Sequence, residues 1–459
     1  MTRYLAPHAL LPDGWAEGVT LEVDPDGRLL EVEVGPVDPG SEPPVRLPGP
    51  VVPGVVNGHS HAFQRALAGG AEALGEAEDS FWGWRDALYD LALRIEPEQM
   101  QVVARQLYTE FLEAGYTAVV EFHYLHHTPS GDPYGDPLEM SRRLAAAARE
   151  AGIGLTLLPV LYQHGDFGGV PPSPAQRRFV TGTDAFLRTL SALHSGVLDD
   201  LAPVRTGVAF HSLRAVGPRA IFEVLPASPG GLPIHIHVAE QPGEVEACIG
   251  WSGRRPVEWI LGELPVDESW SLVHCTHMEA REVRALAASG ATAGLCPSTE
   301  ANLGDGLFPL QSFLEAGGAF AVGSDSHVST SPVEELRWLE YGQRLLTGRR
   351  TVAAAALHSS TGRALLGGSW RSGSAVAGVE VGGLRSGERA DWLVLDADHP
   401  ILAGRFGDGL LDAWVFSGNV PPLREVWVRG RRVVAEGRHP RREEYAAAFR
   451  RVMGELLGG

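Results

Sequence analysis

The sequence contains no lysine: all 38 basic residues of the 459-residue chain are arginine. Without a lysine amine the protein can form neither a Schiff base nor a carbamylated bridge between two metal ions. Cysteine is also scarce, and the three cysteines, Cys248, Cys275 and Cys296, are widely spaced with no C-x-x-C pair. This spacing argues against a disulfide framework and a structural zinc knuckle, and it predicts free thiols in a reducing cytosol.

Positive charge is in deficit, because the formal net charge is −19. Such a surface repels the phosphates of nucleic acid and of anionic membranes, so we expect neither as a partner. Residues 1–7 lack the apolar core of a signal peptide, and no uninterrupted apolar segment is long enough to span a membrane. We therefore expect a cytoplasmic protein.

Apolar runs of strand length alternate with helix-like segments between residues 53 and 372. The runs are the one that ends in His59-Ser60-His61 and residues 117–122, 154–160, 205–210, 233–238, 270–274, 292–296 and 319–323. Helical patterns lie between them, at 97–114, 138–151, 243–261 and 332–346. The eight strand–helix units predict an α/β fold, a (β/α)8 barrel.

The two ends of the chain have a different pattern. Residues 1–52 and 373–459 contain short strand-like runs separated by turn signals, and a final helix is predicted at 442–457. We expect both ends to build one small β-sandwich domain, with the barrel at 53–372 inserted between them.

Metal-binding and acid–base side chains stand at four predicted strand ends. They are His59 and His61 on the first strand, His235, His237 and Glu240 on the fifth, His274 on the sixth and Asp325 after the eighth. Singly, such a histidine is more often hydrogen-bonded structure than a ligand, and a Ser-Asp-Ser turn often caps a helix. The carboxyl ends of barrel strands meet at one face, however. Together they predict a catalytic metal site of three imidazoles and one carboxylate, with a position open for water.

The fifth strand leaves one choice open. His235 and His237 point to the same face, because side chains alternate along a strand. We favour His237 as the ligand, because it stands three residues before Glu240. His277 and His327 are expected to support the site or the fold.

Several longer motifs carry a resemblance to a known family. They are residues 57–66 (NGHSHAFQRA), 79–85 (DSFWGWR), 121–127 (EFHYLHH), 211–214 (HSLR) and 324–327 (SDSH). These motifs resemble the formimidoylglutamate deiminases of histidine degradation, in the mononuclear deaminase branch of the amidohydrolase superfamily. That branch lacks a bridging lysine, and the resemblance extends over nearly the whole chain.

The resemblance implies a metal-dependent hydrolytic deiminase. One divalent cation, zinc in preference to ferrous iron, is expected on His59, His61, His237 and Asp325. Asp325 would also accept the proton of the attacking water, Glu240 would exchange protons with the substrate nitrogen, and His274 would orient the attacking water.

The implied substrate is N-formimino-L-glutamate, a small dianion, with N-formyl-L-glutamate and ammonia as products. Because the protein is acidic, arginine must capture this substrate locally, through bidentate bonds to its carboxylates. The resemblance selects Arg85 and Arg214 for this role, with Gln64, Tyr124 and His211 as further polar contacts. Related barrels commonly form dimers, so a homodimer is expected.

Two other functions remain open from the sequence. A mononuclear deaminase of a heterocycle, such as guanine, a pterin or an adenosine derivative, would keep the metal ligands but would need an aromatic, largely neutral pocket. A non-catalytic scaffold that retained the amidohydrolase fold is the second, although such proteins usually lose ligands or acid–base residues. The ammonia released from each substrate distinguishes the deaminases, and metal content distinguishes the scaffold.

Overall fold

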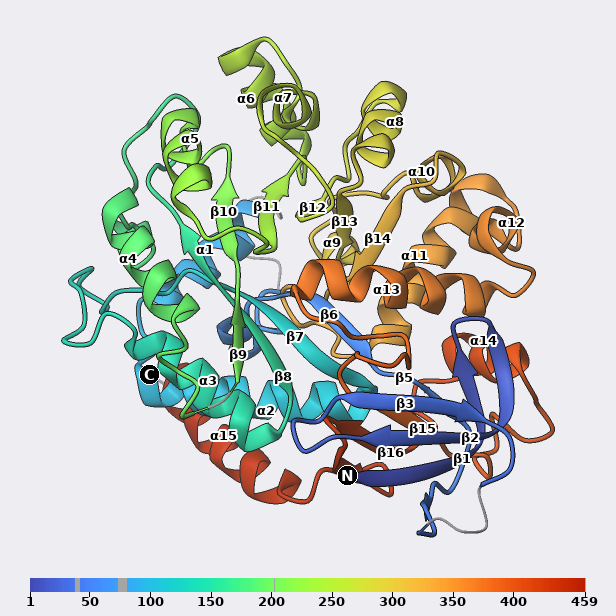
Figure 1. The fold of residues 1–459 in the computed structure, drawn as a ribbon. Helices are drawn as coiled ribbons and strands as arrows, with labels where there is room; N and C mark the ends of the chain where they lie inside the picture. The colour runs from blue at the N-terminus through green and yellow to red at the C-terminus, as the bar shows by residue number, and fades with distance from the viewer. Residues whose placement is uncertain (38–41, 73–80, 202, 459) are drawn as a thin grey trace.

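The computed structural model describes residues 1–37, 42–72, 81–201 and 203–458, which form a barrel and a smaller β-domain (Figure 1). Eight parallel strands follow one another around the barrel. They are β6 (Val55–Ser60), β7 (Tyr116–His123), β8 (Gly154–Leu161), β10 (Val208–Ser212), β11 (Ile234–Val238), β12 (Trp270–His274), β13 (Thr292–Leu295) and β14 (Ala319–Val322). A short strand, β9 (Val204–Thr206), pairs with β8. The predicted barrel is confirmed.

Burial on both faces explains the apolar sequence of these strands. Every residue of β7 and β8 is buried, because side chains on one face fill the barrel and those on the other meet the surrounding helices. The helices of the barrel units and their loops are η1 (Ala62–Ala66), α1 (Phe81–Ala92), α2 (Pro97–Ala114), α3 (Glu139–Ala151), η2 (Pro174–Gln176), α4 (Thr183–His194), α5 (Pro218–Ala227), α6 (Pro242–Ser252), α7 (Pro256–Glu263), α8 (Ala280–Ser289), α9 (Pro297–Asn302), α10 (Leu310–Glu315), α11 (Pro332–Thr347), α12 (Val352–Leu357) and α13 (Thr361–Ala377).

One helix prediction is wrong. The single helix expected at 243–261 is two helices, α6 and α7. Gly253 ends α6 in the left-handed conformation, with φ of +74°, and Pro256 begins α7. A proline is favoured at the first position of a helix but breaks the interior of one, so the chain turns between these two residues.

The β-domain joins the two ends of the chain. Its strands lie in the order β17-β16-β15-β5-β1-β2-β3, with β4 beside β1. They are β1 (Thr2–Leu11), β2 (Gly14–Val23), β3 (Leu29–Val34), β4 (Val45–Arg46), β5 (Val51–Pro53), β15 (Trp392–Leu395), β16 (Leu423–Val428) and β17 (Arg431–Ala435). Figure 1 shows the blue N-terminal strands beside the C-terminal β15 and β16. Helices α14 (Asp408–Phe416) and α15 (Arg442–Leu457) complete the chain.

A separate aromatic core holds this domain together. Tyr4 from the N-terminal end packs edge-on against Trp392 and Trp427, with ring centroids 5.3 and 4.9 Å away. The domain boundaries predicted at residues 52 and 372 fall within β5 and α13, two elements that connect the β-domain to the barrel.

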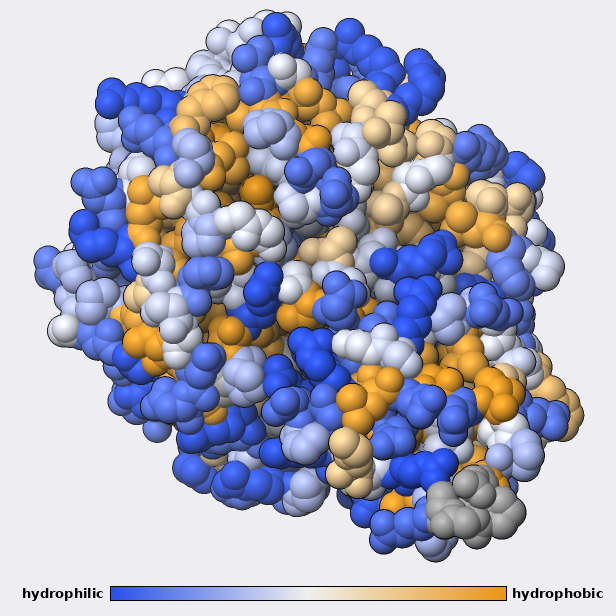
Figure 2. All heavy atoms as spheres, viewed as in Figure 1, coloured by the Kyte–Doolittle hydropathy of each residue, from blue (hydrophilic) through white to orange (hydrophobic). Residues whose placement is uncertain are grey.

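The surface is mainly hydrophilic at its rim. Figure 2 shows hydrophilic residues over the outer helices, with hydrophobic residues exposed between them. Within the part of the chain that the structure describes, no helix combines the length and the apolar composition needed to cross a membrane.

The barrel closes where β6 meets the turn after β14. The backbone N–H groups of Ser324 and Asp325 both donate to the carbonyl of His59, at 3.1 Å each. The Asn57 side chain reinforces this contact: its Nδ2 donates to Ser324 Oγ at 2.6 Å, and its Oδ1 accepts from the N–H groups of Ser324 (3.1 Å) and His59 (3.3 Å). Closure therefore fixes His59 and Asp325 beside each other.

We expect Asn57→Ala to lower the free energy of unfolding by about 1–3 kcal/mol, because the buried His59 N–H loses its acceptor and the Ser324 N–H keeps only the His59 carbonyl. Metal binding should weaken as well, because Asn57 holds the end of β6 against the turn after β14, and both carry predicted ligands. Calorimetric Tm and zinc content check both effects. The control is Asn302→Ala, because Asn302 is exposed and bonds only to Glu72 among the described residues. Equal Tm values for the two variants would show that closure does not depend on Asn57.

Candidate active site

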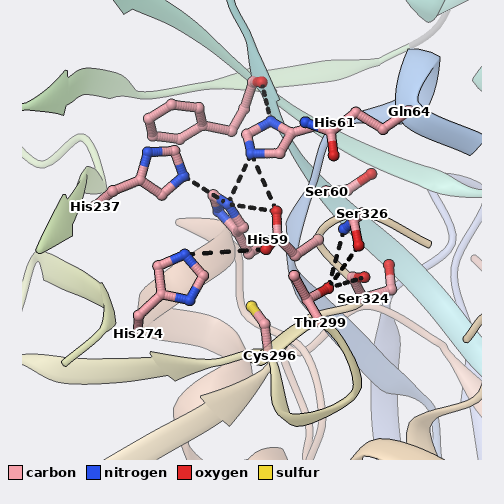
Figure 3. Close-up of polar contacts among 12 residues, drawn as sticks. His59, Ser60, His61, Gln64, His237, His274, Cys296, Thr299, Ser324 and Ser326 are labelled. Atoms are coloured by element: carbon pink, nitrogen blue, oxygen red, sulfur yellow. Dashed lines mark hydrogen bonds and ion pairs between the residues drawn. The ribbon is translucent and has the colours of Figure 1, made fainter. Parts of the chain in front are cut away.

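Four buried side chains converge at the carboxyl ends of the barrel strands (Figure 3). His59 Nε2 lies 3.1 Å from His61 Nε2 and 2.9 Å from His237 Nε2. Asp325 Oδ1 lies 3.2 Å from His61 Nε2 and 3.6 Å from His59 Nε2. The structure thus brings together the four predicted metal ligands, from β6 and the residue after it, from β11 and from the turn after β14.

The outer nitrogens of two imidazoles are held by the backbone. His61 Nδ1 lies 2.9 Å from the carbonyl oxygen of Phe122, and His237 Nδ1 lies 2.8 Å from that of His211. Carbonyls only accept, so both Nδ1 atoms donate, and each Nε2 faces the other members of the group.

The charges of the group suit a divalent cation. Burial holds the pKa values of His59 and His237 well below the usual range, so both imidazoles are neutral. Burial opposes the charge of Asp325, but the hydrogen bond and charge of His61 outweigh it and lower the pKa of that carboxyl group. Three imidazoles and one carboxylate are a donor set that fits a zinc-like cation with room for a water molecule.

The backbone is strained at three of these strand ends. Ala239, His274 and Asp325 have φ values of +52°, +71° and +47°, in the left-handed region that favours glycine. Such conformations persist where the surroundings over-determine them, and they cluster at functional sites.

Three further ionisable groups stand beside the four ligands. His274 Nε2 lies 3.8 Å from Glu240 Oε1 and 3.9 Å from Asp325 Oδ2, and Arg214 NH2 lies 3.8 Å from Glu240 Oε2. Burial raises the pKa of Glu240. Burial opposes the charge of His274, but Glu240, the Glu300 hydrogen bond and Asp325 together raise its pKa to about 10. All three contacts exceed hydrogen-bond length, which leaves these groups able to bond a small molecule between them.

One cavity contains every predicted substrate-binding residue. Gln64 from η1, Arg85 from α1, Tyr124 after β7, His211 from β10 and Arg214 line it. The same cavity is lined by His61, His237, Glu240, His274 and Asp325. The structure therefore places the predicted binding, catalytic and metal residues around a common space, except that His59 does not line it and instead contacts the lining residues His61 and His237. Of the DSFWGWR motif, residues 79 and 80 lie outside the described residues.

Polar contacts order the aromatic wall of the cavity. Gln64 Nε2 donates to Tyr124 OH at 2.9 Å, and the Tyr124 ring lies edge-on to His61 with centroids 5.1 Å apart. The Arg85 guanidinium lies 5.5 Å from the centroid of the Tyr89 ring. These contacts hold three predicted substrate residues, Gln64, Tyr124 and Arg85, in place.

Three polar residues that the sequence did not predict also line the cavity. Gln176 Nε2 donates to Tyr162 OH at 2.5 Å and lies 3.3 Å from Tyr89 OH, and all three side chains line the cavity. Tyr162 directly follows β8, so its strand-end position was a usable signal. Tyr89 and Gln176, on α1 and η2, carry no such signal.

Three histidines that were not assigned a catalytic, binding or metal role, His235, His277 and His327, each have a hydrogen-bond partner in the fold. His235 Nε2 donates to the carbonyl of Val376 at 2.9 Å, at the end of α13, so His237 is the histidine of this strand that joins the ligand group. His277 Nε2 lies 2.8 Å from the carbonyl oxygen of Asp305. His327 Nε2 accepts from the His61 backbone N–H at 3.2 Å and thereby supports a predicted ligand.

Comparisons with known proteins place the chain in a family. The profile described as "Amidohydrolase family" matches residues 51–433, and "Formimidoylglutamate deiminase HutF, N-terminal domain" matches residues 1–44. The formimidoylglutamate deiminase of Pseudomonas aeruginosa is 51% identical over 457 residues, covering 100% of both chains. The chain belongs to the formimidoylglutamate deiminase family of the amidohydrolases.

Two further proteins, one compared by structure and one by sequence, are also similar to this member of the formimidoylglutamate deiminase family. The crystal structure of an amidohydrolase from Brucella melitensis is 46% identical, covers 100% of both chains and superposes with a TM-score of 0.93. The 5-methylthioadenosine/S-adenosylhomocysteine deaminase of Natronomonas pharaonis is 31% identical and covers 77% of this chain and 74% of its own.

Proposed function

We propose that the protein hydrolyses N-formimino-L-glutamate to N-formyl-L-glutamate and ammonia in histidine degradation. The observation that carries this proposal is the single cavity in which a metal-type ligand set faces Arg85 and Arg214. The full-length similarity to the Pseudomonas aeruginosa deiminase supports the same substrate.

One divalent cation, zinc in preference to ferrous iron, would be held by His59, His61, His237 and Asp325. When bound, such a cation lowers the pKa of water from about 16 toward neutrality, so that hydroxide forms at ambient pH. The donor types support zinc, which binds imidazole nitrogen and carboxylate oxygen in open catalytic sites.

The side chains around the cavity divide the proton transfers between them. Asp325 accepts a proton from the attacking water, which His274 orients toward the formimino carbon. The C–O bond forms as the C=N bond becomes single. Glu240 delivers a proton to the terminal nitrogen, and the proton that Asp325 accepted completes the leaving ammonia. As the C–N bond breaks, the C=O bond forms and the hydroxyl group returns its proton to Glu240. Glu240 is suited to this exchange because burial raises its pKa, which lets it hold a proton closer to neutral pH.

The arginines would bind the two carboxylates of the substrate. Arg214 adjoins Glu240, and Arg85 lies on the α1 side of the cavity, so the substrate would lie between them with its formimino group at the ligand set. Gln64, Tyr124 and His211 supply further polar contacts. We also propose a cytoplasmic homodimer, on the basis of the bulk composition and the family resemblance.

Deamination of a heterocycle is the alternative function, because the relative from Natronomonas pharaonis is named as a deaminase of adenosine derivatives. A neutral ring would bring no negative charge to the two arginines that line the cavity, which favours a dianionic substrate. A scaffold without activity is disfavoured by the complete set of ligand and acid–base residues in one site.

We expect ammonia release from N-formimino-L-glutamate to require metal. A coupled ammonia assay should show activity with zinc, its loss after dialysis against a chelator, and its return when zinc is added. Methylthioadenosine, guanine and 8-oxoguanine are the comparison substrates. Faster ammonia release from a heterocycle would overturn the substrate, and full activity in metal-free protein would overturn the cation site.

A further inference from the structure

Three consecutive residues of the short helix α9 bind three different parts of the barrel. Ser298 Oγ donates to Glu335 Oε1 of α11 at 2.6 Å. Thr299 Oγ1 donates to the carbonyl of Ser324 at 3.3 Å and lies 2.9 Å from Ser326 Oγ, on either side of Asp325 (Figure 3). Glu300 contacts His274 at the end of β12. Although β13 carries no predicted ligand or acid–base residue, the helix that follows it contacts His274 directly and both sequence neighbours of Asp325.

The Glu300 contact is specific and buried. Its Oε1 lies 3.3 Å from His274 Nδ1 and also accepts the backbone N–H of Cys296 at 3.0 Å. The exposed fraction of Glu300 is 3%, and that of His274 is 1%. Glu300 is not among the residues that line the cavity, so it acts on the reaction only through another side chain.

The position of Nδ1 decides where the other ring nitrogen points. With Nδ1 bonded to Glu300, His274 Nε2 faces Glu240 and Asp325, at 3.8 and 3.9 Å. Neither of those contacts is short enough to fix the ring. Among the described residues, Glu300 is the only group within hydrogen-bond distance of Nδ1, so a ring flip is opposed mainly by this contact.

We propose that Glu300 is a positioning residue that sets the ring orientation of His274 for deimination. The proposal rests on the proposed function of the cavity. Thr299 fixes the turn that carries Asp325, through its contacts with Ser324 and Ser326. Neighbouring residues of one helix thus hold an acid–base residue and a predicted metal ligand. Partners of this kind typically change activity or metal affinity by about 10–100-fold when removed.

The test compares Glu300→Ala, Glu300→Gln and Thr299→Val in the full-length, zinc-loaded protein. Glu300→Ala should lower kcat by about 10–100-fold, with KM and zinc content within about twofold of the wild type. Glu300→Gln keeps an oxygen acceptor and should recover most of the loss. Thr299→Val should instead weaken zinc retention in equilibrium dialysis. The control is Glu315→Ala, because Glu315 is exposed and bonds to Gln311 on its own helix.

A crystal structure of Glu300→Ala supplies a readout that does not depend on turnover: the His274 ring should rotate away from its present orientation. An unchanged ring, or kcat within twofold of the wild type, would overturn the proposal. A fall in Tm with proportional loss of zinc and activity would show that Glu300 only stabilises the fold, which also overturns it. A wild-type protein that releases no ammonia would instead contradict the proposed function, and the crystal structure would still decide the role of Glu300.

Discussion

Replacing Glu240 by glutamine should lower kcat for N-formimino-L-glutamate by about 10²–10⁴-fold while zinc remains bound, as expected for the loss of a general acid–base group. Glutamine has the same shape as glutamate but cannot exchange a proton with the departing nitrogen. Glu240 does not belong to the converging ligand group, so the cation site should keep its donors. Steady-state kinetics and zinc analysis on the same preparation measure the two effects.

The matched control is Glu246→Gln, on the exposed side of α6 and six residues away. It should leave kcat unchanged, because it removes a charge of the same sign outside the cavity. The role of Glu240 would be rejected if its glutamine variant kept kcat within about tenfold of the wild type, or if it lost zinc in parallel with activity, because it would then act on metal binding.

The barrel and the ligand set could be predicted because both leave short-range patterns. A parallel strand buried on two faces is a continuous apolar run, and residues 154–160 predicted β8 to within one residue. Barrel geometry then gathers residues at strand ends whatever their distance in sequence, so His59, His61, His237 and Asp325 could be expected to meet.

Helix boundaries were less predictable where a pattern continues through a break. The apolar spacing across 243–261 suits one helix, and only Gly253 and Pro256 signal its division into α6 and α7. By contrast, α2 is bounded by Pro97 and Gly115, and the prediction of 97–114 is confirmed. A glycine can be accommodated within a helix at a modest cost, so its sequence position alone does not decide between the two outcomes.

The contacts that support the site depend on packing between distant elements, which no local pattern records. Glu300 meets His274, and Asn57 meets Ser324 across 267 positions, because of the register and rotation of particular strands and helices. The choice between His235 and His237 has the same origin. The two share a strand face, and only the position of Val376 shows which one is engaged elsewhere.

Substitution of Arg214 by alanine should lower kcat/KM for N-formimino-L-glutamate by two or more orders of magnitude without loss of zinc. A buried charged contact of this kind is worth about 2–5 kcal/mol when one partner is removed. Arg214 lines the cavity beside Glu240, and its guanidinium carries the positive charge that an acidic protein needs to bind a dianion. Arg214→Lys should recover only part of the loss, because lysine keeps the charge but not the two parallel donors.

A substrate without carboxylates distinguishes a loss of carboxylate binding from general damage to the active site. Formamidine has the reacting amidine group but no carboxylate, so its slow hydrolysis should be nearly the same in wild type and Arg214→Ala. The control is Arg219→Ala, because the Arg219 side chain is 93% exposed on the following helix, and it should leave both substrates unaffected. An equal loss toward formamidine and N-formimino-L-glutamate would assign Arg214 to the organisation of Glu240. A loss confined to the dianion would place a substrate carboxylate at Arg214, and would thereby distinguish a deiminase of a linear amino acid derivative from a deaminase of neutral rings.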